Sequence, residues 1–142
     1  MSSYKVELFA AHQQLTLEWW ETRRAAFDLY TSQVVIREST EGDAAMAQKR
    51  VNALEGIPLL SVSREAVALA QKLVEKGPIP EKAGIDALHI AVAAANGMGY
   101  SLTWNCKHMA NAEMQVGIER LCRAAGYEPP VICTPEELLG SS

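Results

Sequence analysis

The sequence has few of the features that mark secreted, membrane-spanning or strongly basic proteins. Among its 142 residues are three cysteines, an odd number that fits reduced thiols better than a disulfide framework. No apolar run approaches the roughly 20 residues that cross a bilayer, and the first residues lack the layout of a signal peptide. Thirteen basic and seventeen acidic residues give a net charge of −4, so binding to nucleic acid has to depend on a local patch. We therefore expect a cytoplasmic protein with no membrane segment.

The composition is that of a folded domain. Hydrophobic residues make up 49% of the chain and charged residues 21%, which is typical of a protein with a buried core. No repeat or low-complexity stretch is present, and Gly77-Pro78-Ile79-Pro80 is the one stretch that resembles a linker. Residues 1–142 are therefore predicted to form a single domain.

Hydrophobic spacing predicts alternating helices and strands in the first half of the chain. A helical pattern runs from about Glu7 to Tyr30, and the β-branched stretch Gln33–Arg37 is typical of a short buried strand. Asp43 is an expected N-cap of a helix that ends near Leu54. Residues Pro58–Val62 are predicted to form the next strand.

The second half continues the alternation. Ser63 is expected to cap a helix that ends near Lys76, before Gly77 and Pro78. The remaining predicted elements are a very apolar helix at Lys82–Asn96, a strand at Tyr100–Trp104, a helix from the turn at Asn105 to about Gly126, a strand at Val131–Cys133 and a helix start at Thr134–Glu137. This order predicts an α/β fold, a parallel sheet with helices on both faces.

Three polar residues are expected at the edge of this sheet where ligands bind. Glu38 follows the predicted strand at Gln33–Arg37, Asp86 lies in the first turn of the apolar helix, and Asn105 follows the strand at Tyr100–Trp104. Two carboxylates and an amide are hard oxygen ligands of the kind that Mg²⁺ or Mn²⁺ takes. From spacing alone, a helix-start residue, an N-cap and a solvated surface charge account better for these three residues.

Other residue types give weaker indications. His89, His108 and Cys106 are zinc-ligand types, but their spacing matches no compact zinc motif, and His89 fits a packing role in its apolar helix. Trp19 and Trp20 fit a core or a dimer interface better than a base-stacking platform. The sequence contains no glycine-rich phosphate loop and no nucleophile elbow.

Three stretches of the sequence carry a family resemblance. They are Asp86–Ala91, Leu102–Asn111 and Pro129–Leu138. Together they resemble the PIN domain, and most closely the bacterial branch similar to VapC toxins of type II toxin–antitoxin pairs. The resemblance extends from about Val6 to the C-terminus. It implies a PIN-like three-layer sandwich, a ribonuclease that depends on Mg²⁺ or Mn²⁺, an RNA substrate and an antitoxin protein as partner.

The resemblance also implies roles for the three candidate residues. Glu38 and Asp86 match acids that hold the metal in PIN domains. Asn105 stands where many members have a further aspartate, and would orient the metal or a water molecule. These three residues are the expected catalytic set, with Glu38 and Asp86 as the metal ligands.

The start of the chain departs from the family pattern. PIN domains begin with a central strand that carries a first acid, and this strand is expected to be missing, because the predicted first helix begins near residue 7. The alternating stretch Tyr4–Phe9 is an alternative strand that would bring Glu7 to the site. A missing central strand would leave backbone edges open, so a homodimer is expected, with the Trp19/Trp20 helix as its interface. Two hypotheses follow: a ribonuclease with impaired activity, or a non-catalytic module that binds a protein or RNA.

Overall fold

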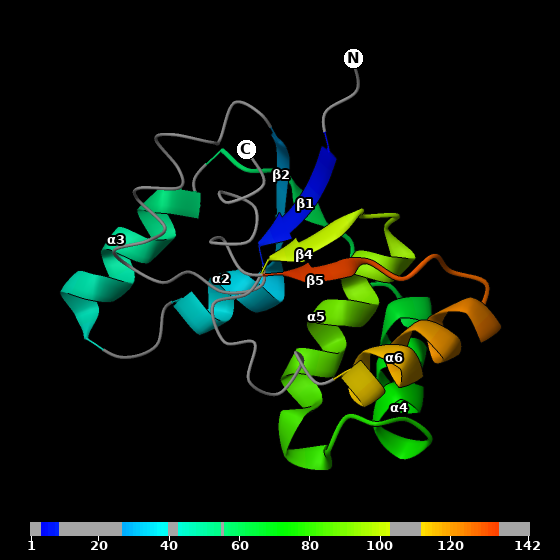
Figure 1. The fold of residues 1–142 in the computed structure, drawn as a ribbon. Coiled ribbons are helices and arrows are strands. Elements are labelled where there is room, and N and C mark those ends of the chain that lie inside the picture. The colour runs from blue at the N-terminus through cyan, green and yellow to red at the C-terminus, as the bar shows by residue number, and fades with distance from the viewer. Residues whose placement is uncertain (1–3, 9–26, 40–42, 55, 103–111, 134–142) are drawn as a thin grey trace.

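Five parallel strands form one sheet in the computed structural model, which describes residues 4–8, 27–39, 43–54, 56–102 and 112–133 (Figure 1). The strands are β1 (Tyr4–Leu8), β2 (Phe27–Ser32), β3 (Leu59–Leu60), β4 (Tyr100–Leu102) and β5 (Val131–Cys133). Their order across the sheet is β3-β2-β1-β4-β5, and every neighbouring pair is parallel. The predicted α/β class with a parallel sheet is confirmed.

The central strand of this sheet is β1, so the expectation that the first strand is missing was wrong. Val6 pairs with Leu29 of β2 on one side and with Tyr100 of β4 on the other. The alternation of polar and apolar residues over Tyr4–Leu8 fits a strand. The predicted helix from Glu7 to Tyr30 is also wrong at both ends, since Glu7 belongs to β1 and Tyr30 to β2.

A second difference concerns residues 33–37, which were expected to be a strand. They form most of α2 (Gln33–Ser39), which begins directly after β2. The β-branched residues of this stretch favour a strand by propensity, but propensity is a weak guide where tertiary contacts decide. Here β2 already occupies the place beside β1, and the Ser32 hydroxyl accepts a hydrogen bond from the Val35 amide at 3.4 Å, as a helix cap does.

The other helices largely follow the sequence predictions. They are α3 (Ala44–Leu54), α4 (Arg64–Glu75), the short 3₁₀ helix η2 (Glu81–Ala83), α5 (Gly84–Ala95) and α6 (Ala112–Ala124). Asp43 Oδ1 accepts a hydrogen bond from the Ala45 amide at 2.8 Å, and Ser63 Oγ accepts one from the Ala66 amide at 3.1 Å. Both predicted N-caps are therefore confirmed.

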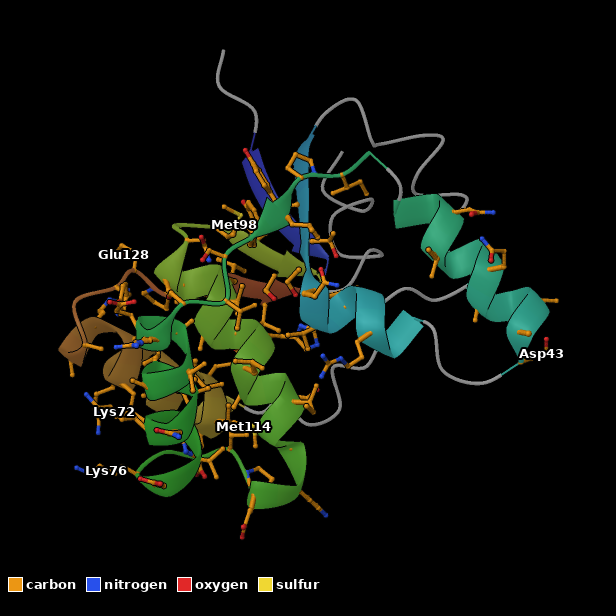
Figure 2. All side chains as sticks on the ribbon, turned by 180° about the vertical axis from the view of Figure 1, so that it is seen from behind. Asp43, Lys72, Lys76, Met98, Met114 and Glu128 are labelled. Carbon is orange, nitrogen blue, oxygen red and sulfur yellow. The ribbon has the colours of Figure 1, made fainter. Side chains whose placement is uncertain are left out.

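The main core lies between the sheet and the helices α4, α5 and α6, which gather on one side of it (Figure 1). Leu73 of α4, Ile90 of α5 and Ile118 of α6 are fully buried in it. A second cluster joins Leu60 of β3 to Met98, which lies between α5 and β4 (Figure 2). The apolar composition of α5 thus reflects a helix covered on most of its surface.

Helices α2 and α3 lie apart from α4, α5 and α6. They are beyond the carboxyl ends of β1, β4 and β5, which the arrowheads mark (Figures 1 and 2). Residues 40–43 connect the two helices, and residues 40–42 lie outside the described ranges. In the part of the chain that the structure describes, no helix is long and apolar enough to cross a membrane.

Candidate functional site

The strand order creates a switch point beside β1. The chain passes from β1 to β2 and β3 on one side, and then returns to place β4 on the other side of β1. In open parallel sheets, ligands bind in the crevice outside the carboxyl ends of the two strands at such a point. Glu7 is the penultimate residue of β1 and sits in register between Tyr30 of β2 and Ser101 of β4. An acidic residue therefore occupies a strand position next to the expected ligand crevice.

Asp86 lies in the first turn of α5, as predicted. Residues 96–99 join the end of α5 to the start of β4, and the helix packs against that strand. A helix joined to a strand by so short a connection runs back antiparallel to it, and the first turn of α5 lies at the end of the helix that is farthest from the sheet (Figures 1 and 2). Asp86 is half-buried and has interaction partners of its own.

Glu38 does not follow a strand directly, which corrects the sequence prediction. It lies in the last turn of α2, six residues after the end of β2. At 1.5 Å of rise per residue, this separates its backbone from the strand end by roughly 9 Å along the helix axis. Glu38 lies there because residues 33–37, which were expected to be a strand, form a helix. Asn105, the third candidate, lies outside the described residues.

Buried hydroxyl groups near the switch point were not recognised from the sequence. Thr31 and Ser32 close β2, Ser101 is the middle residue of β4, and all three are fully buried. Among the described residues, Thr31 Oγ1 has no hydrogen-bond partner. The sequence signal that could have found them is the presence of small polar residues in strands that are otherwise rich in apolar and aromatic residues.

The remaining chemically active side chains in the described part belong to the core. His89 is fully buried in α5, which confirms its predicted packing position. Cys122 is fully buried in α6, and this burial raises the pKa of its thiol from 9.0 to about 11, with the nearby Arg123 acting in the opposite direction. A thiol that stays protonated at neutral pH is a poor nucleophile and a poor metal ligand.

The candidate residue types, carboxylates and an amide, are those that bind Mg²⁺ and Mn²⁺ through oxygen. Of the two predicted metal ligands, the structure describes the side chain of Asp86. For Glu38 it describes the backbone alone. Within the described ranges, no three histidine, cysteine, aspartate or glutamate side chains gather into a metal-binding group.

Basic side chains on α4 lie away from the end of the sheet where the site is expected. Lys72 and Lys76 project from the outer surface of α4, whereas Asp43, at the start of α3, marks the opposite side of the molecule (Figure 2). These two lysines therefore do not line the crevice beyond β1 and β4.

Comparison of the chain with family models, with curated proteins and with solved structures finds no match.

Proposed function

We propose that the protein is a PIN-like ribonuclease that hydrolyses RNA phosphodiester bonds with Mg²⁺ or Mn²⁺. The observation that carries the proposal is the place of β1: it is the central strand, and it puts Glu7 beside the switch point of the sheet. The PIN-like sequence of Asp86–Ala91 supports it independently. The proposal includes the three-layer PIN arrangement with helices on both faces of the sheet.

In this proposal Asp86 and Glu38 hold the metal, Glu7 adds a third carboxylate, and Asn105 orients the metal or the attacking water. Glu7 replaces the first acid that was expected to be missing. When bound, Mg²⁺ or Mn²⁺ supplies Lewis-acid stabilisation for the negative charge that develops on the phosphate oxygens. Three carboxylates provide enough anionic oxygen for a cation that two carboxylates would hold weakly.

The acidic residues also determine how the chain can approach its substrate. Carboxylates repel an RNA phosphate at close range, so productive contact requires that their charge be balanced before RNA enters. A net charge of −4 gives no long-range attraction for RNA. We therefore expect activity to depend strictly on added divalent cation.

The expected partners remain part of the proposal. An antitoxin protein as partner follows from the resemblance to VapC toxins, and a cytoplasmic location follows from the odd number of cysteines. The argument for a homodimer changes, because β1 fills the centre of the sheet that was expected to be open. Dimerisation through the Trp19/Trp20 segment stays a prediction, and these residues lie outside the described ranges.

The second hypothesis is a PIN-like module that binds a protein or RNA without cutting it. The position of Glu38 favours this alternative, since the last turn of α2 is farther from the strand ends than the predicted site requires. A cation site that lacks this carboxylate would have one anionic ligand fewer.

Titration of Mn²⁺ into the purified protein by calorimetry distinguishes the two hypotheses. We expect saturable binding by the wild-type chain and loss of binding in Asp86→Asn, which keeps the shape of the side chain but removes its charge. Glu81→Gln is the matched control, because Glu81 is an exposed acid five residues earlier and has no assigned role. Metal-dependent cleavage of single-stranded RNA, abolished by EDTA and by Asp86→Asn, is the expected second result. Binding of RNA without Mn²⁺ affinity or cleavage would support the non-catalytic alternative.

A further inference from the structure

The C-terminal end of α5 is closed by a hydrogen-bonded cap. Gly97 has a positive φ of 72°, and its amide donates a hydrogen bond to the Ala94 carbonyl at 3.2 Å. The Met98 amide donates another to the Ala93 carbonyl at 2.9 Å. These two hydrogen bonds define a Schellman motif, in which a glycine takes the left-handed position. Asn96 therefore stands at the cap position, directly before the glycine.

The side chain of Asn96 joins this cap to a distant part of the chain. Its Nδ2 group donates one hydrogen bond to the Val92 carbonyl of α5 at 2.8 Å, and a second to the Ser61 carbonyl at 2.9 Å. Ser61 directly follows the edge strand β3, which pairs with β2 through two residues. One amide group thus uses both of its hydrogens to hold β3 to the end of α5.

The dipeptide Asn96-Gly97 is also chemically reactive. In such a sequence the glycine backbone nitrogen can attack Cγ of the asparagine side chain, because glycine has no Cβ to obstruct the approach. A bond forms between this nitrogen and Cγ, the bond between Cγ and Nδ2 breaks, and ammonia leaves with the proton of the glycine amide. Water then opens the succinimide ring to aspartate or isoaspartate. The chain and water are the reactants that this deamidation needs.

The folded geometry opposes each part of the reaction. Ring closure requires that Cβ of Asn96 and the Gly97 nitrogen be nearly eclipsed about the Cα–C bond. At the observed ψ of 7°, the Gly97 nitrogen instead eclipses the backbone nitrogen of Asn96, so Cβ lies out of the ring plane. The attacking amide is bonded to Ala94, and two carbonyl groups hold the leaving group. The cap therefore has to open before Asn96 can react.

We propose that Asn96 is a deamidation site that the folded chain keeps unreactive, and that its conversion to aspartate releases β3 from α5. An ionised carboxylate has no hydrogen to donate, so an aspartate would place negative oxygen atoms beside two carbonyl oxygens. Leu60, which precedes Ser61, belongs to the buried cluster of Val92 and Met98. Loss of the two hydrogen bonds is therefore expected to loosen this cluster.

The first test measures deamidation of the wild-type protein at pH 8, with and without urea. Peptide mapping by mass spectrometry distinguishes asparagine, aspartate and isoaspartate at position 96. We expect deamidation of the folded protein to be at least about 10-fold slower, because two side-chain hydrogen bonds have to break first. Equal rates with and without urea would overturn the protection of Asn96 by the fold.

The second test compares Asn96→Asp with the matched control Asn52→Asp. Asn52 is exposed on α3, and its Oδ1 accepts a hydrogen bond from Gln48 at 2.8 Å, so an aspartate keeps this bond. We expect Asn96→Asp to accelerate hydrogen–deuterium exchange of residues 59–62 about 10-fold, and Asn52→Asp to leave it unchanged. If Asn96→Asp does not fold, Asn96→Ala removes the same two donors without adding a charge. Exchange at the wild-type rate in the Asn96 variant would overturn the connection between β3 and α5.

Discussion

Cys122 shows at the scale of one residue how burial controls reactivity. Its thiol is fully enclosed by the core that α4, α5 and α6 form, and the charged form of a thiol is disfavoured there. The raised pKa follows from this loss of hydration, and the favourable contribution of Arg123 is smaller. Burial therefore protects this cysteine from alkylation and oxidation without a disulfide.

We expect the native protein to alkylate slowly at Cys122. At pH 8 a shift of the pKa from 9.0 to about 11 lowers the thiolate fraction about 100-fold. Iodoacetamide labelling followed by peptide mapping, with and without urea, measures this site separately from the other two cysteines. Equal labelling rates with and without urea would contradict the burial of Cys122.

The same shift has a consequence for stability at alkaline pH. The pKa of the Cys122 thiol is higher in the folded state than in the unfolded chain. The stability that this thiol contributes is therefore fully present below pH 9. The free energy of unfolding falls as the pH rises from 9 toward 11, because the unfolded chain releases the proton first.

The residue scale also shows what the sequence could tell about the site. Asp86 could be named as a candidate because an acid in the first turn of a very apolar helix stands out. Ser101 gave no functional signal in the sequence, because a single small polar residue fits an ordinary strand position. That Ser101 lies beside the acidic position of β1 follows from the register between β1 and β4, which joins residues more than 90 positions apart.

At the scale of elements, the sequence predictions located β3, β4, β5 and two capped helix starts, but they missed β2. Ser63 and Asp43 were correct because a cap acts within three residues of itself. The prediction of a strand at 33–37 was wrong. A run of β-branched residues favours a strand, but it does not determine whether the sheet has a place for that strand. The exposed residues Val62 and Val67 also have a local explanation, since they flank the Ser63 cap at the positions of a hydrophobic staple.

The contact between the Gly77–Pro80 segment and α6 gives a prediction at this scale. A Cβ atom on Gly117 of α6 would lie 2.9 Å from Cγ of Pro78, closer than carbon atoms normally approach. Gly117→Ala is therefore expected to destabilise the protein by about 1 kcal/mol through overpacking, although alanine normally favours a helix. The measurement is urea unfolding followed by circular dichroism.

The control for this experiment is Gly84→Ala, at the first residue of α5. A Cβ atom at Gly84 meets nothing within 4 Å, and the backbone there is already helical. This variant is expected to stabilise the protein by about 0.5 kcal/mol. A gain in stability for both variants would mean that Pro78 does not pack on Gly117.

At the scale of the whole molecule, the sheet depends on its N-terminal strand. Amide hydrogens of β1 are predicted to exchange as slowly as those of β4, because β1 pairs with a strand on each side. Hydrogen–deuterium exchange with mass spectrometry tests this directly, with the buried helix α5 as the internal reference. Fast exchange over residues 4–8 together with a protected α5 would show that the centre of the sheet lies elsewhere.

The position of β1 also affects how the protein is made. Its first neighbour, β2, is synthesised soon after it, but Tyr100, the partner of Val6 on the other side, follows 94 residues later. At 5–20 residues per second, one edge of β1 waits roughly 5 to 19 s for its partner on the ribosome. During this interval the nascent chain presents an open strand edge, and such edges pair readily with other chains. A strand that is translated late therefore completes the hydrogen-bond pattern of a strand made 94 residues earlier.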